Sequence, residues 1–494
     1  ELGRRKSVTL ARYSVVKSTF ANEILFGTLQ GVERFVQLGA DIEEIDEYGF
    51  SPLTEASIAN KIDVVALLLE YGVDINQADT TGRTALHWAA DNHNLPLCEL
   101  LLANKADANA YTLAGQTVLV YPLLRQQIEL KKLLYRYGAE LNFAQDFIQV
   151  KLLGHRYELA GQVDILNAAG RFIEIDYEGF FLEFTLDVIL NSLQRYQHHF
   201  SSRHLRPHFE ELQKLLAAFS NAQALLKYQR YTINIEQYTH SIDIDILLDQ
   251  ELLLLPLAYE GHAIALVKYK DWLIRCDRGE NSRREGSIVI YQMQHPYAWN
   301  NDLCRQLIYV RQSAEFLTKT IHRLLGLVPV ATLPMKGQIS GNCSWANIEA
   351  SIPAMLFLLQ LSTHDDLFHE AEKYQQQALQ VYKDWQTWDK DRALEACIQG
   401  FYYSNKARKA TKATLLAAIL FQKSTQNLRD LKQAEAILRI LSLPDYSYLL
   451  KSYLKIYWQR HKTPQGKDLI TLLDSCGVNL ESLYTKDCGD TTAP

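Results

Sequence analysis

Several features that would assign a chain of 494 residues to a specialised class are missing from this sequence. Its longest apolar run, residues 252–258, is far shorter than the roughly 18 residues that a membrane-spanning helix needs. No signal-peptide pattern opens the chain. Basic residues are outnumbered by acidic ones, and the formal net charge of -6 argues against a general attraction to nucleic acid. We therefore expect a protein that works in the cytosol, without a membrane and without direct binding of nucleic acid.

Paired cysteines are also lacking. The seven cysteines are odd in number, widely scattered and free of any C-x-x-C spacing, which argues against a disulfide framework and a zinc ribbon. At least one thiol is therefore free for chemistry. The group His364, Asp365, Asp366 and His369 offers metal-ligand side chains, but no further cluster supports it. We interpret this group as a solvated helix start, and expect neither a metal nor a cofactor.

A repeat is present in the N-terminal third. Gly49, Gly82 and Gly115 stand 33 residues apart, and each opens a copy of one motif, best kept in Thr84-Ala85-Leu86-His87-Trp88-Ala89. This period and motif are those of ankyrin repeats. We predict about four repeats over residues 17–150, after an N-terminal extension of residues 1–16. His87 is interpreted as a hydrogen-bonding core residue, and Pro122 is expected to kink or shorten a helix of the fourth repeat.

Ankyrin repeats bind partners through side chains at adjacent hairpin tips. The sequence places the following residues there: Glu43, Glu44, Asp46, Glu47, Asp79, Thr80, Tyr111 and Thr112. We predict that these residues bind a partner protein, and the acidic first tip favours a basic one. Nothing in the pattern points to an oligomer, and we expect a monomer.

Strand-like runs occupy the centre of the chain, at 232–235, 252–257, 263–269, 272–276 and 287–291. They predict an antiparallel sheet with apolar side chains on both faces, covered by the helices on either side. If Lys270 and Asp271 form a two-residue turn, residue 264 faces 277 and residue 262 faces 279. His262 and Asp277 then lie diagonally on one face and can meet. A histidine oriented by an aspartate is suited to act as a general base.

A second segment, residues 336–347, leads from a glycine-bearing loop into an apolar helix. Cys343 stands at this entry, where the positive end of the helix and a nearby His262 would favour thiolate. Gln338, on the same loop, could donate a hydrogen bond to an oxyanion. A His–Asp pair across a hairpin is more often structural, and a lone cysteine at a helix start is usually inert. Their joint presence nevertheless favours a cysteine-catalysed site.

The order His262, Asp277, Gln338, Cys343 resembles that of the circularly permuted papain-like proteases, which include adenovirus endopeptidase, the SUMO-deconjugating proteases and the YopJ-type bacterial effectors. The resemblance implies that Cys343 is the nucleophile, His262 the base, Asp277 the residue that orients it and Gln338 the oxyanion-hole residue. Asn342 stands where the deconjugating proteases have aspartate.

The layout as a whole is similar to that of the ankyrin-repeat effectors that Legionella injects into host cells by type IV secretion. This resemblance implies a virulence factor that acts in the host cytosol or nucleus. We thus expect an α+β protein with an ankyrin-repeat α-solenoid, a papain-like cysteine protease domain at 151–362 with an antiparallel sheet, and a helical region at 363–494.

Three functions remain open. The chain is a thiol protease or deconjugating enzyme whose ankyrin repeats select a host protein, a cysteine acyltransferase or deamidase on the same residues, or a catalytically inactive scaffold for protein–protein interaction. The first two share a covalent thioester step and differ only in the acceptor.

Overall fold

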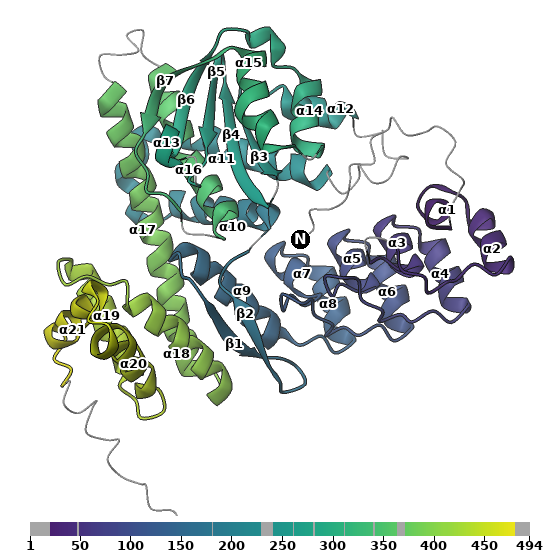
Figure 1. Ribbon diagram of the computed structural model, residues 1–494, viewed down its shortest axis with the longest axis horizontal. Coiled ribbons are helices and arrows are strands. Elements are labelled where there is room, and N and C mark those ends of the chain that lie inside the picture. Colours follow the sequence, from purple (N-terminus) through teal and green to yellow (C-terminus); the bar gives the residue numbers. More distant parts are fainter. Residues whose placement is uncertain are drawn as a thin grey trace, which may run out of the picture. The chain divides into compact units, whose positions relative to one another are not determined.

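The computed structural model of the chain is shown in Figure 1. It describes residues 20–46, 49–179, 181–228, 241–259, 261–279, 282–310, 312–338, 341–362 and 371–479. Several features expected from the sequence lie outside these ranges: the N-terminal extension, Glu47, the strand at 232–235, the group from His364 to His369, and Cys488.

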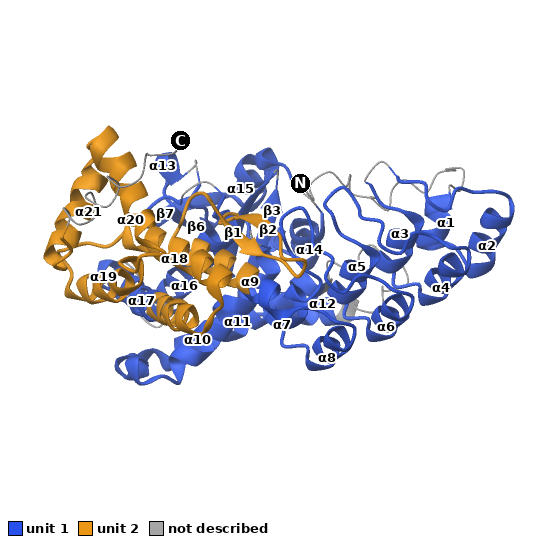
Figure 2. Cartoon of the chain, turned by 90° about the horizontal axis from the view of Figure 1, so that it is seen from below, with its two compact units in different colours: residues 1–145, 179–388 blue, residues 146–178, 389–494 orange. Residues whose placement is uncertain are grey.

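The chain divides into two compact units (Figure 2). The first contains residues 1–145 and 179–388, and the second contains residues 146–178 and 389–494. These limits differ from the domain boundaries expected at 150 and 362. Residues 146–178 pack with the C-terminal helices, because Asp146 is a buried carboxylate that binds Arg408 and Lys412. The strand Phe172–Asp176 belongs to this second unit.

The first unit begins with helix pairs at the predicted repeat spacing. The helices are α1 (Phe20–Phe26), α2 (Leu29–Gln37), α3 (Pro52–Ile58), α4 (Ile62–Glu70), α5 (Ala85–Asp91), α6 (Leu95–Ala103), α7 (Val120–Leu124) and α8 (Ile128–Arg136). The side chain of Ser51 caps α3, and Pro52 occupies its first turn. Helix α7 has 5 residues and contains Pro122, whereas α3 and α5 have 7. This agrees with the expected shortening.

His87 holds two neighbouring repeats together. Its Nδ1 accepts a hydrogen bond from Thr84 N at 3.1 Å, and its Nε2 lies 3.2 Å from Gln116 O in the following repeat. Burial, together with the charge of Arg83, lowers the pKa of His87 to about 3. The ring is therefore neutral in the core at any physiological pH, which confirms the structural interpretation.

An antiparallel sheet forms the centre of the first unit, and its strands follow one another in chain order (Figure 1). They are β3 (Leu252–Tyr259), β4 (His262–Tyr269), β5 (Trp272–Cys276), β6 (Ile288–Met293) and β7 (Leu327–Leu333). In the β4–β5 hairpin Tyr269 pairs with Trp272 and Ala265 with Cys276, as the two-residue turn predicts. Lys270 takes the positive φ of 51° that this turn requires.

Helices cover this sheet. Helix α16 (Cys343–Ser362) packs against β4 and β5, and α11 (Phe209–Tyr228) packs against β3. Both contact each other and α10 (Leu182–Gln197). Helices α12 (Ser241–Leu248) and α14 (Asn301–Tyr309) pack together, and α14 also contacts β3. The unit also contains shorter elements: the 3-10 helices Phe200–His208 and Pro296–Ala298, α13 (Ser282–Glu285), α15 (Ile321–Leu325) and the π-helical turn Phe316–Thr320.

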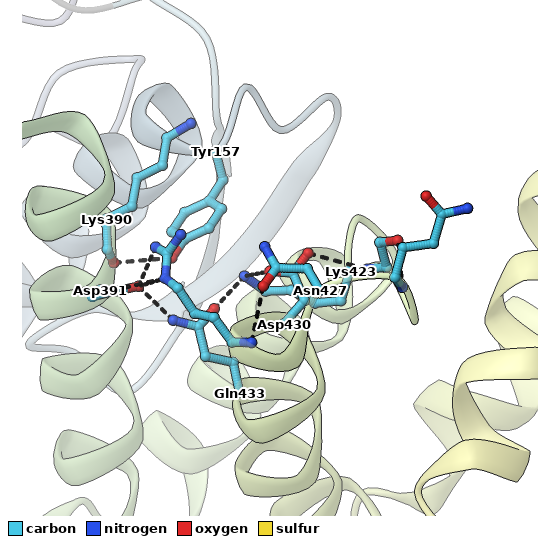
Figure 3. A network of polar contacts seen from close by, with 10 residues as sticks. Tyr157, Lys390, Asp391, Lys423, Asn427, Asp430 and Gln433 are labelled. Carbon is cyan, nitrogen blue, oxygen red and sulfur yellow. Dashed lines mark hydrogen bonds and ion pairs between the residues drawn. The ribbon is translucent and has the colours of Figure 1, made fainter. Parts of the chain in front are cut away.

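The second unit is mostly helical. It contains the hairpin of β1 (Gln162–Leu166) and β2 (Phe172–Asp176). Its helices are the end of α9 (Leu141–Arg156), the end of α17 (Ala371–Tyr403), α18 (Lys406–Leu420), α19 (Leu428–Leu441), α20 (Ser447–Leu454) and α21 (Pro464–Ser475). Polar contacts tie several of these together (Figure 3): Asp391 accepts hydrogen bonds from Arg429 and Gln433, and Tyr157 donates to Lys390 O.

The basic stretch of α18 is joined to α9, since Arg408 Nε and Lys412 Nζ lie 2.7 Å and 3.0 Å from the Asp146 carboxylate. Among the tyrosines of the C-terminal helices, Tyr446 is buried, whereas Tyr402, Tyr403 and Tyr448 are exposed.

Candidate active site

His262 is the first residue of β4, and Asp277 follows the last residue of β5. The hairpin register brings both to the same end of the two strands. His262 Nε2 lies 2.9 Å from Asp277 Oδ1, so the predicted contact is confirmed. The same carboxylate oxygen accepts a second hydrogen bond from Gly279 N at 2.9 Å. Asp277 is buried, and both bonds fix its carboxylate against the histidine ring.

Gly279 makes the approach of these groups possible. A Cβ atom at position 279 would lie 2.9 Å from His262 Cε1 and 3.0 Å from Asp277 Oδ1. Such distances are too short for real side-chain contacts, and the atoms that would be displaced are those of the His–Asp pair itself. Any side chain at this position would push the ring or the carboxylate out of place.

Cys343 is the first residue of α16, a helix of 20 residues. Its thiol is half-buried and shares a hydrogen bond with the side chain of His262. The backbone at Ala263 and Ser344 contributes further hydrogen bonds to the sulfur. Cys343, His262 and Asp277 therefore form one connected chain, in which the histidine ring lies between the thiol and the carboxylate.

The electrostatics of this chain favour charge separation. Burial opposes ionisation of His262, but its hydrogen bonds with Asp277 and Cys343 outweigh burial and raise the pKa of the ring to about 9. Burial also opposes ionisation of the thiol, yet the hydrogen bond with His262 lowers the pKa of Cys343. Burial would raise the pKa of the Asp277 carboxyl, but its hydrogen bonds with His262 and with Gly279 N lower it. The geometry thus supports a thiolate–imidazolium pair near neutral pH.

The other described cysteines behave differently. Burial raises the pKa of Cys98, Cys304 and Cys397 to about 12, and it also raises the pKa of Cys276 and Cys476. Among the cysteines that the structure describes, Cys343 is the one whose pKa is lowered.

Gln338 is linked to the same group of residues through the backbone. Its N–H donates to the carbonyl of Arg278, the residue after Asp277, at 2.9 Å. Its side chain is half-buried, and Oε1 is buried without a hydrogen-bond partner among the described residues. The amide group is therefore not fully engaged in structural contacts. Residues 339 and 340, which lead from it toward Cys343, lie outside the described ranges.

The ankyrin tips depart from the expectation at two positions. Asp79 and Thr112 do not project, since each is 7% exposed. Asp79 Oδ1 accepts hydrogen bonds from Thr81 N and Arg83 N, and Thr112 Oγ1 accepts one from Gln116 N. The short polar side chains at these positions close the hairpins on which they stand, which is a common use of such residues in turns.

Glu43 is exposed, but it also connects two repeats. Its Oε1 accepts a hydrogen bond from Asp74 N at 2.7 Å. Asn76 and Asn109, at the same position of the following repeats, accept equivalent bonds from Asp107 N and Glu140 N at 2.8 Å and 2.7 Å. A change at Glu43 therefore affects the stacking of repeats as well as surface charge.

The remaining tip residues vary in exposure. Glu44 and Thr80 are exposed, and Asp46 is half-buried, with Oδ1 accepting from Phe50 N at 2.7 Å. Tyr111 is half-buried with its ring edge-on to Phe143. Leu113, which was not singled out in the sequence, is 80% exposed at the tip of the third hairpin. The position of a leucine between Thr112 and Gly115 was the signal that could have revealed it.

The fourth repeat joins the ankyrin stack to the sheet domain. The ring of Tyr121 on α7 lies 4.1 Å from that of Phe184 on α10, and Arg125 forms a buried ion pair with Glu183. Gly179 N, just before α10, donates to Gly341 O at 3.2 Å. Gly341 stands two residues before Cys343, so this junction borders the loop that carries the thiol.

Comparison with known proteins agrees with this architecture. The ankyrin-repeat family matches residues 23–112 and 76–145, which makes the chain an ankyrin-repeat protein. It is also similar to the structure of the Legionella effector AnkH, with 43% sequence identity, a TM-score of 0.84, and coverage of 97% of this chain and 100% of that chain. The chain belongs to the AnkH family of Legionella effectors. Comparison with the curated proteins found no match.

Among the described residues, no helix is long and apolar enough to cross a membrane. No cluster of three or more histidine, cysteine or acidic side chains in those ranges is arranged to hold a metal ion.

Proposed function

We propose that this protein is a secreted bacterial effector that binds a host protein through its ankyrin repeats and acts on it with a thiol protease-like site. Cys343 is the nucleophile, His262 the base and acid, Asp277 the residue that orients the ring, and Gln338 the oxyanion donor. The observation that carries the proposal is the connected chain in which the Cys343 thiol, at the start of α16, hydrogen-bonds with His262, whose ring is held by the buried carboxylate of Asp277. The resemblance to the permuted papain-like proteases, in residue order, supports the same roles.

The chemistry follows from the ionised pair. The thiolate of Cys343 attacks a carbonyl carbon, and the carbonyl oxygen takes up the negative charge within reach of the Gln338 amide. When the intermediate collapses, the bond to the leaving group breaks and His262 gives that group its proton. The thioester is then attacked by water, whose proton passes to the now neutral His262. Cleavage of the carbon–sulfur bond releases the acid and restores the thiolate–imidazolium pair.

The acceptor of the second step distinguishes the alternatives. Water gives a protease, a deconjugating enzyme or, with a side-chain amide as substrate, a deamidase, whereas an amine or hydroxyl gives an acyltransferase. An inactive scaffold would retain the ankyrin surface without turnover. The complete His–Asp–Cys geometry favours an active site over a scaffold, because a scaffold has no need for a thiol of lowered pKa.

A small activated ester tests catalysis without knowledge of the substrate. With p-nitrophenyl acetate, Cys343 displaces nitrophenolate and becomes acetylated. We expect a burst of nitrophenolate equal to the protein concentration and an acetyl group on the peptide that contains Cys343, detected by mass spectrometry. Cys343→Ala should give no burst. A wild-type protein without a burst, acetylated equally on several cysteines, would leave the scaffold as the remaining function.

The proposed site of action rests on the AnkH relationship. That protein is an effector of Legionella, and we propose that this chain is likewise delivered into a host cell and acts in the host cytosol or nucleus. The exposed Glu44 and the half-buried Tyr111 at the hairpin tips are proposed to take part in partner binding.

A further inference from the structure

Asn347 is a fully buried amide in the helix that begins with Cys343. It stands one turn further along α16 and is 0% exposed. The residues beside it in the helix, Ala346 and Ile348, are also fully buried and apolar. An apolar residue would therefore suit this position in an ordinary helix–sheet contact. A buried amide is costly unless both of its ends are hydrogen-bonded.

Both ends of the Asn347 amide are satisfied, and the two bonds reach different parts of the site, one in β4 and one in the segment after β5. Nδ2 donates to Ala263 O at 2.5 Å, and Oδ1 accepts from Arg278 N at 2.7 Å. Ala263 is the residue after His262, and Arg278 is the residue after Asp277. One side chain on the nucleophile helix thus holds the backbone beside the base and the backbone beside the acid.

Arg278 extends this connection to the loop of Gln338. Its guanidinium is buried, and Nε donates to Lys336 O at 2.8 Å. Its own carbonyl accepts the hydrogen bond from Gln338 N at 2.9 Å. Arg278 therefore contacts the Gln338 loop at two points, while its N–H is held by Asn347.

We propose that Asn347 and Arg278 are positioning residues of the Cys343 site. Asn347 sets the distance between the first turn of α16 and the His262–Asp277 pair, and Arg278 sets the loop that carries Gln338 against the same pair. Neither side chain is required to contact the reacting atoms. This inference rests on the proposed function of the site.

Asn347 is expected to affect ionisation of the thiol, and Arg278 is expected to affect stabilisation of the oxyanion. Substitutions at the two positions should therefore change different measurements. Loss of the Asn347 bonds lets the helix start move relative to His262, so the hydrogen bond that lowers the pKa of Cys343 weakens. Loss of the side-chain hydrogen bond from Arg278 Nε to Lys336 O leaves the thiolate–imidazolium pair in place but loosens the loop that carries Gln338, so the oxyanion is stabilised less. A purely structural role would reduce stability without changing either property selectively.

The first experiment measures the rate of alkylation of Cys343 by iodoacetamide in the full chain from pH 5 to pH 10. At pH 6.5 we expect Asn347→Ala to react about tenfold more slowly than wild type, with its pH profile moved toward that of an ordinary thiol. Asn347→Asp keeps the volume and the acceptor for Arg278 N but cannot donate to Ala263 O. Asn347→Asp should also slow the alkylation of Cys343, and it serves as the test variant if Asn347→Ala does not fold.

Ser351→Ala is the matched control. Ser351 lies on the same helix, one turn beyond Asn347, is 0% exposed, and donates from Oγ to Ile348 O at 2.6 Å. Its removal also deletes a buried hydrogen bond, but that bond stays within α16 and does not reach β4 or the segment after β5. We expect a lowered melting temperature with an unchanged alkylation profile. If Asn347→Ala and Asn347→Asp alkylate as Ser351→Ala does, the positioning role of Asn347 is refuted.

The second experiment uses Arg278→Lys, which keeps the charge but lacks the guanidinium Nε–H. We expect an alkylation profile close to that of wild type and a burst with p-nitrophenyl acetate that is about tenfold slower, because acylation passes through an oxyanion whereas alkylation does not. A normal burst rate, or a shifted alkylation profile, would overturn the role given to Arg278. If wild type itself shows neither fast alkylation nor a burst, the proposed function fails, whatever the variants do.

Discussion

The ring of His262 is held to Asp277 by a hydrogen bond of 2.9 Å between Nε2 and Oδ1, and Gly279 N donates to the same carboxylate oxygen. With Nε2 engaged in this way, the other ring nitrogen is the one available to the thiol of Cys343. Asp277 thereby fixes both the orientation of the ring and the position of its protons. The hairpin turn at Lys270 and Asp271 is the origin of this geometry, because it sets the register that brings positions 262 and 277 together.

The first prediction concerns the reactivity of the thiol. At pH 6.5 Cys343 should be alkylated by iodoacetamide faster than every other cysteine, and His262→Ala should remove this advantage. Asp277→Asn should weaken it, because the imidazolium loses its carboxylate partner. Peptide mapping after short exposure to the reagent gives the rate at each site. Equal rates across the cysteines of the wild type would contradict the lowered pKa of Cys343.

The second prediction concerns the space at Gly279. Gly279→Ala places a methyl group 2.9 Å from His262 Cε1, and we expect it to displace the ring and slow alkylation of Cys343 at pH 6.5 by about tenfold. Gly286→Ala is a useful comparison, since Gly286 has a φ of 97° but the nearest atom to its Cβ position, Thr332 Cγ2, is 3.4 Å away. It should lower stability through backbone strain alone and leave the thiol as reactive as in wild type.

The third prediction is a dependence of stability on pH. The folded state raises the pKa of His262 to about 9, so it binds the proton more tightly than the unfolded chain does. The resulting stabilisation is fully present below the unfolded pKa of about 6.5 and is lost as pH rises through about 9. His262→Ala should therefore reduce the free energy of unfolding by more at pH 6 than at pH 10. Chemical denaturation at both values measures the difference, and an equal loss at both would contradict the raised pKa.

Much of this arrangement could be predicted from the sequence, because it depends on local rules. The repeat period defined the ankyrin helices, and a two-residue turn fixed the positions of His262 and Asp277. What could not be predicted depends on contacts distant in the chain. Asn347 resembles any polar residue near a helix start until its partners at Ala263 and Arg278 are known.

The limits of the second unit were missed for a similar reason. Residues 146–178 follow the repeats directly, and only the burial of Asp146 against Arg408 and Lys412 shows where they belong. The two tip residues that are buried were predicted wrongly for another reason. Asp79 and Thr112 have the polarity of surface residues, but short polar side chains in turns often bind their own backbone, and here they do.

The fourth prediction separates partner binding from catalysis. Glu44→Lys combined with Leu113→Ser changes two exposed tip residues whose side chains make no hydrogen bond between repeats in the described structure, and Tyr111→Ala truncates a third position. We expect weaker capture of a host protein from lysate and an unchanged rate of Cys343 alkylation. Cys343→Ala should do the opposite, retaining capture while abolishing the ester burst.

Glu43 supplies the control for this last experiment, because it has two roles that different substitutions can separate. Glu43→Gln removes the charge but keeps an oxygen that accepts from Asp74 N, whereas Glu43→Lys removes both. If charge at the first tip attracts a basic partner, both variants should capture less, and only Glu43→Lys should also lower the melting temperature. Capture that falls only with Glu43→Lys would instead point to repeat stacking. Full capture by residues 151–494 alone would show that the ankyrin repeats are not the recognition element.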